Sequence, residues 1–88
     1  MDVSTTPAVE RVARVLAGQR ISANADGDAE SAGSQVDAVW RDYLPDAIAV
    51  MKTLREPDSA MAAAGDPRVW ESMILAGLES AKPETVVL

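Results

Sequence analysis

Residues 34–54 read SQVDAVWRDYLPDAIAVMKTL, and this stretch carries the longest periodic run of apolar residues in the chain. From Val36 to Leu54 the apolar residues recur every three or four positions, which is the spacing of one face of an α-helix. Residues 34–37 have the form of a capping box and predict a helix start. Pro45 interrupts the stripe, and a proline inside a helix removes one hydrogen bond and crowds the preceding turn. Because the stripe keeps its phase across Pro45, we expect one kinked helix, although two helices divided there also fit the pattern.

A shorter helix is predicted before this stretch. Thr6 is suited to the N-cap, Pro7 to the first helical position, and Gly18 to the C-terminal stop. Small and polar residues dominate 19–33, so a flexible acidic loop is expected there. Aligned with an EF-hand, this loop lacks the required ligands at both ends, so no metal is predicted.

After the apolar stripe that ends at Leu54, proline and glycine residues mark the boundaries of two further predicted helices. Pro57 ends the helix before it, and residues 58–64 read as a short helical turn stopped by Gly65. Asp66 and Pro67 then have the pattern of an N-cap followed by a first helical residue. The helix they begin is expected to end at Lys82-Pro83, leaving residues 83–88 as a frayed tail.

These signals predict an all-α fold, a small bundle of three principal helices plus a short connecting helix. With 88 residues, one domain spanning 1–88 is the natural count. A chain of this length buries a small core, so its stability margin is expected to be thin unless it oligomerises.

Composition bears on the chemistry. The chain has no Cys and no His, which removes thiolate chemistry, the commonest general base and the commonest metal ligand. We therefore expect no catalytic residues, no metal and no cofactor. Asp42 and Asp46 lie four residues apart, and we interpret them as part of a solvated helix face rather than as metal ligands.

Charge and hydropathy bear on the partners and the location. Fourteen acidic and eight basic residues give a net charge of −6, which disfavours direct binding of nucleic acid and suits a basic protein surface. The apolar runs are too short to span a membrane, and the N-terminus lacks a secretory signal. We expect a cytoplasmic protein that makes no membrane contact.

The large side chains have two interpretations. Trp40, Tyr43 and Trp70 are expected to anchor the core, although Trp and Tyr are also enriched at interface hot spots. Three methionines could line an adaptable groove for a partner helix, but core filling is the preferred interpretation for them; they are Met51, Met61 and Met73. The candidate partner-binding residues are Asp37, Trp40, Asp42, Tyr43 and Asp46.

The order of several motifs is similar to that of a known group of small proteins. The motifs are the run from Trp40 to Ala47, Leu54-Arg55-Glu56-Pro57, the segment 60–65, and Trp70-Glu71-Ser72-Met73-Ile74. Across residues 7–80 they resemble small uncharacterised helical proteins encoded by phages and prophages of alphaproteobacteria and related bacteria. The resemblance implies a phage or mobile-element context and supplies no catalytic residue.

Three functional hypotheses follow. The first is an acidic, non-catalytic protein that binds and inhibits a host protein, such as one of a defence complex, by occupying a basic surface. The second is a self-associating structural or accessory phage protein, which makes a homo-oligomer possible. The third and weakest is a DNA-associated regulator that binds through Arg11, Arg14 and Arg20.

Overall fold

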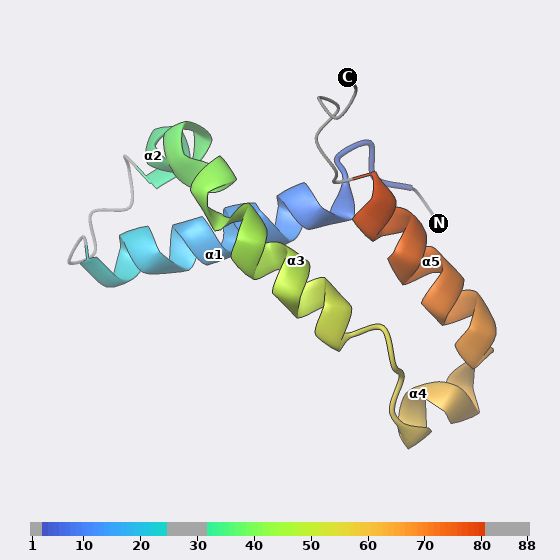
Figure 1. Ribbon diagram of the computed structural model, residues 1–88. Coiled ribbons are helices and arrows are strands. Elements are labelled where there is room, and N and C mark those ends of the chain that lie inside the picture. The colour runs from blue at the N-terminus through green and yellow to red at the C-terminus, as the bar shows by residue number, and fades with distance from the viewer. Residues whose placement is uncertain (1–2, 25–31, 81–88) are drawn as a thin grey trace.

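The computed structural model describes residues 3–24 and 32–80, and all regular structure within them is helical (Figure 1). The elements in chain order are α1 (Ala8–Asn24), α2 (Ala32–Val39), the 3₁₀ helix η2 (Trp40–Tyr43), α3 (Leu44–Thr53), α4 (Ser59–Ala64) and α5 (Pro67–Glu79). The predicted all-α fold is confirmed. Its three principal helices are α1, α3 and α5, and α4 is the short connector.

Helix α1 continues past Gly18, where the sequence predicts a stop. A Cβ atom at Gly18 would lie 3.7 Å from Cγ2 of Val36, so this glycine sits where α2 packs on α1. A glycine inside a helix costs roughly 1 kcal/mol, and tertiary packing routinely overrides a preference of that size. The helix therefore keeps its geometry through Gly18.

The predicted loop at 19–33 is wrong at both ends. Residues 19–24 belong to α1 and residues 32–33 belong to α2, while the part between them lies outside the described residues. The helix expected to begin at Ser34 thus begins two residues earlier, at Ala32. The predicted tail at 83–88 also lies outside the described residues.

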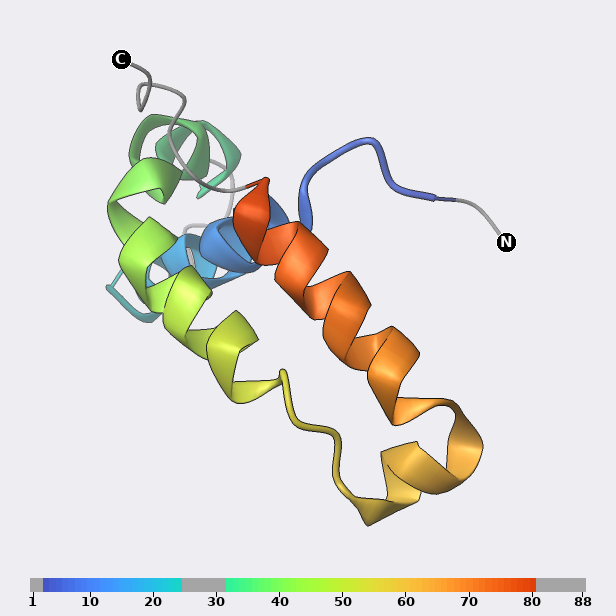
Figure 2. The ribbon, with the colours of Figure 1, turned by 45° about the vertical axis from the view of Figure 1, so that its right-hand side comes forward.

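The expected kinked helix is two helices divided by η2. Helix α2 ends at Val39, and α3 begins at Leu44 with Pro45 in its first turn, where a missing N–H costs no hydrogen bond. The chain changes direction through η2, as Figures 1 and 2 show. The apolar stripe keeps its phase because Trp40 and Tyr43 of η2, like α3, pack against the same core.

The starts of α4 and α5 and the end of α4 follow the sequence signals, whereas α5 ends at Glu79 and not at the predicted Lys82-Pro83. The Asp58 carboxylate accepts a hydrogen bond from the Met61 N–H at 2.9 Å, and Asp66 accepts one from Arg68 N–H at 2.9 Å. These side chains satisfy the free N–H groups at the starts of α4 and α5. Gly65 lies between them as the C-cap of α4.

The core is small and rests on three helices. Its buried side chains come from α1 (Val9, Ala13 and Ala17), α3 (Ala47 and Met51) and α5 (Ile74), and half of them are alanines. Trp40, Tyr43 and Trp70 pack against this core but stay half-buried, so their predicted role as core anchors is confirmed only in part. A Cβ atom at Gly77 would lie 3.0 Å from Cε of Met51, which shows how closely α5 approaches α3.

The arrangement leaves one end of the molecule outside the core. In Figures 1 and 2, α3 and α5 form two arms that α4 joins at one end, while α1 crosses them toward the other. No buried core side chain among the described residues comes from α4. The α4 end therefore presents its apolar side chains at the surface.

Candidate functional site

Two of the predicted partner-binding residues, Asp37 and Trp40, lie around the side chain of Arg14. The Arg14 guanidinium donates to Glu10 Oε2 at 2.8 Å and to Asp37 Oδ1 at 2.7 Å. Its Cζ atom lies 5.1 Å from the centre of the Trp40 ring, and Cζ of Arg41 lies 4.5 Å from the same ring. This cluster ties α2 and η2 to α1, so Asp37 and Trp40 have structural contacts within the chain.

The charge of Arg14 is matched within this cluster. The hydrogen bonds that Arg14 donates to Asp37 and, as the smaller effect, to Glu10 raise the pKa of Arg14 above its ordinary value. With both carboxylates in contact with it, the guanidinium is poorly placed to bind a phosphate group. The weakest hypothesis, DNA binding through Arg11, Arg14 and Arg20, therefore has one of its three residues already engaged.

The other three predicted residues do not join this cluster. Tyr43 packs against the core and is half-buried. Asp42 and Asp46 are exposed on η2 and on the first turn of α3. The five predicted residues thus divide into an ion-pair cluster, a core contact and two exposed carboxylates, and their role in binding stays a prediction.

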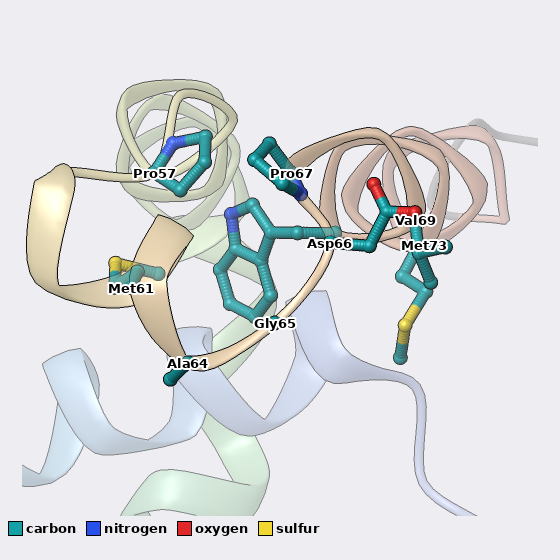
Figure 3. A pocket seen from close by; sticks show the side chains of 9 residues that line it. Pro57, Met61, Ala64, Gly65, Asp66, Pro67, Val69 and Met73 are labelled. Atoms are coloured by element: carbon teal, nitrogen blue, oxygen red, sulfur yellow. The ribbon is translucent and has the colours of Figure 1, made fainter.

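An apolar groove lies between α4 and α5 (Figure 3), where the preferred sequence interpretation places core-filling methionines. Its volume is about 400 Å³, and it is lined by Pro57, Met61, Ala64, Gly65, Asp66, Pro67, Val69, Trp70 and Met73. Figure 3 shows Met61 on the α4 side of the groove and Met73 on the α5 side. Among the described residues of the lining, Asp66 alone has a charged side chain.

Several of the lining side chains are open to solvent. Met73 is 63 % exposed and Val69 is 53 % exposed, although both are apolar residues on α5. Trp70 is half-buried, and its indole Nε1 donates to the Leu54 carbonyl at 2.7 Å, which fixes the ring between α3 and α5. The groove is consequently a preformed apolar surface with a rigid aromatic wall.

The methionines show which sequence signal could have revealed this groove. Met51 is buried, as the core-filling interpretation predicts. Met61 and Met73 instead line the groove, which was the alternative interpretation. Periodicity alone could not separate the two cases, because Met73 and the buried Ile74 are adjacent in sequence and both fit the stripe of α5.

The surroundings of the groove are mainly acidic. From Glu56 to Trp70 the charged residues are three acids, Glu56, Asp58 and Asp66, and one base, Arg68. The neighbouring Arg55 lies 3.7 Å from Glu71 and is balanced by it. Residues 56–70, which supply most of the lining, therefore carry a net negative charge, and we call their three acids the negative rim.

A second apolar depression lies between α1 and α3. Its volume is about 440 Å³, and its lining includes Val12, Val15, Leu16 and Val50 together with the cation Arg11. Val15 is 60 % exposed, and the surface lies on helices that also build the core. It provides a matched apolar surface for control substitutions.

No cluster of three or more His, Cys, Asp or Glu residues suited to a metal ion occurs in residues 3–24 and 32–80. In the same ranges, no helix has the length and apolar character needed to cross a membrane. Comparisons with protein-family models, with curated proteins and with solved structures found no match to this chain.

Proposed function

We propose that this protein is a small, acidic, non-catalytic cytoplasmic protein that acts by binding another protein through the groove between α4 and α5. The observation that carries the proposal is the apolar lining of this groove at the α4 end, where the connector α4 contributes no buried core side chain among residues 3–24 and 32–80. Exposed apolar surface of this kind marks interaction sites, since a folded chain gains nothing for its own stability by exposing it.

The negative rim favours a partner with a basic surface. Glu56, Asp58 and Asp66 would attract such a surface and exclude acidic ones, because like charges brought together at an interface cost several kcal/mol. With the resemblance to phage-encoded proteins, this favours a host protein, such as a component of a defence complex, as the target. Inhibition would follow from covering a basic surface that the target needs.

The test is affinity capture with a matched pair of variants. The tagged wild type, the double variant Met61→Gln/Met73→Gln and the control Val15→Gln are each used to capture proteins from host lysate. A partner identified by mass spectrometry is then purified, and its affinity for the three proteins is measured by isothermal titration calorimetry. We expect about tenfold or greater weakening for the groove variant and little change for the control.

A partner that binds the groove variant as tightly as the wild type would refute the groove as the binding surface. Self-association is the competing function, and the small alanine-rich core favours it. Sedimentation equilibrium separates the two functions: a wild-type dimer that Met61→Gln/Met73→Gln dissociates would show that the groove holds a second copy.

A further inference from the structure

We infer that the occupant of the α4–α5 groove is an amphipathic helix of the partner, with apolar side chains facing the groove and basic side chains along its edges. This inference rests on the function proposed above and names the chemistry of the partner. It is carried by the hydrogen-bonding capacity of the groove and by the charges around it.

The groove offers almost nothing to an extended peptide backbone. Its walls are the helices α4 and α5, and helices have no open strand edge of the kind that strand addition requires. Between the helices, the Gly65 N–H already donates to the Met61 carbonyl at 3.1 Å. An extended segment would leave its own amides unpaired against the apolar lining, whereas a helix satisfies its backbone internally.

A polyproline segment fits no better. Such a segment has no internal hydrogen bonds, so in an aromatic groove its carbonyls need donors from the wall. The side chains that line the groove hold one N–H donor, Nε1 of Trp70, and this donor is already bonded to the Leu54 carbonyl at 2.7 Å. Indole has no second N–H to give.

The side chains of the lining match the apolar face of a helix. A groove of about 400 Å³ takes a few large side chains of the kind that a helix presents at positions i, i+3, i+4 and i+7. Methionine suits such a surface because its unbranched side chain adapts to different shapes. Met61 and Met73 supply this adaptability from the two sides of the groove, and Trp70 supplies the rigid wall.

The charges select the polar face of the occupant. Asp58 and Asp66 lie at the two helix starts beside the groove, and Glu56 precedes the lining residue Pro57. Arg68 offsets one of these three charges. Lys or Arg on the edges of the docked helix would meet the two remaining negative charges, whereas a phosphorylated or acidic peptide would be repelled.

The probe for this inference is a pair of synthetic 14-residue peptides of about four helical turns, a length chosen from helix geometry. Both carry Leu at the i, i+3, i+4 and i+7 positions of one face; one carries Lys on the remaining exposed positions and the other carries Glu. The full-length chain with Trp40→Phe has Trp70 as its only tryptophan, so its fluorescence reports events in the groove. Circular dichroism measures whether the peptide becomes helical on binding.

We expect the Lys peptide to bind and to shift the Trp70 emission, with the Glu peptide at least about tenfold weaker. Met61→Gln/Met73→Gln should weaken the Lys peptide by about tenfold, and Val15→Gln in the α1–α3 depression should leave it unchanged. These substitutions preserve the net charge, so non-specific attraction of a basic peptide to an acidic protein would survive both equally.

Equal binding of the two peptides, or Lys-peptide binding that the groove substitutions leave intact, would overturn the inference. The inference would also be overturned if the Lys peptide did not bind while a purified partner bound the groove variant more weakly than the wild type. That last result would leave the proposed function standing with an occupant of another form. A wild-type dimer that the groove variant dissociates would contradict both proposals.

Discussion

Replacing Val9 by Ala tests whether the small core at the α1 end holds the molecule together. Val9 is 1 % exposed and is the largest side chain that the structure buries completely. The substitution removes two methyl groups, each worth about 0.8 kcal/mol of transfer free energy, and the cavity left behind adds to that loss. We expect the free energy of unfolding to fall by about 2 to 3 kcal/mol.

The matched control is the same substitution at Val15, on the same helix. Val15 is 60 % exposed, so Val15→Ala forfeits roughly 0.5 kcal/mol of burial and regains a similar amount in helix propensity. We expect almost no net change. Because Val→Ala alters the same atoms at both sites, the difference between the two variants measures burial.

Urea denaturation followed by far-UV circular dichroism is the assay. For a domain of this size the free energy of unfolding falls by about 1 kcal/mol per molar urea, so the midpoint for Val9→Ala should fall by about 2 to 3 M. A fold of 88 residues is expected to have a total stability of about 4–13 kcal/mol, so this loss would be a large fraction of it. Equal midpoints for Val9→Ala and Val15→Ala would refute the packing of α1 described above.

Two further predictions concern contacts between helices. Gly77→Leu should destabilise the fold by up to about 2 kcal/mol, because a Cβ atom at this position would lie 3.0 Å from Met51 Cε, and overpacking of about 1–3 kcal/mol outweighs about 1 kcal/mol of helix propensity. A thermal midpoint above that of the wild type would contradict this. Arg14→Gln should speed hydrogen exchange at the amides of α2, because it removes the ion pairs of Arg14 and its contact with Trp40, while the amides of α5 keep their protection. The carboxylate partners raise the pKa of Arg14, so its positive charge is lost only as the pH rises through that raised value. The effect should therefore be constant across neutral pH. Unchanged exchange in α2 would show that Arg14 does not hold α2 on α1.

The features that the sequence predicted correctly depend on local chemistry. Asp58 and Asp66 cap α4 and α5 because a short carboxylate side chain can reach the free N–H groups two or three residues ahead. Pro67 fits the first turn because its fixed φ suits a helix and its missing N–H costs nothing there. These effects need no information from distant parts of the chain.

The features that the sequence predicted wrongly depend on contacts between helices. Gly18 has the local character of a stop, yet α1 runs through it because Val36 of α2 packs against it. Pro45 divides two helices, but the hydrophobic stripe runs on across it because η2 and α3 face the same core. No window of sequence around either residue contains the partner that decides its conformation.

The candidate site was harder to predict than the fold, for a related physical reason. An apolar residue on a helical stripe has the same pattern whether the facing surface belongs to its own chain or to another. In α5, Ile74 is buried in the core, and Trp70 and Leu78 pack against the same core. These three side chains form the face that attaches α5 to the rest of the molecule. Val69 and Met73 widen the apolar face beyond it and remain more than half exposed.

The extra width of the apolar face of α5 argues for partner binding more strongly than the volume of the groove does. If α5 served only to complete the core, polar residues at positions 69 and 73 would improve solubility without loss of packing. Met73 and Met61 lie on the two sides of one groove, so the apolar excess of α5 meets that of α4 in a single surface. Exposed apolar residues with no role in a partner interface would be scattered over the surface. Here two adjacent helices direct apolar residues that the core does not need at one groove, as expected of a surface that a partner covers.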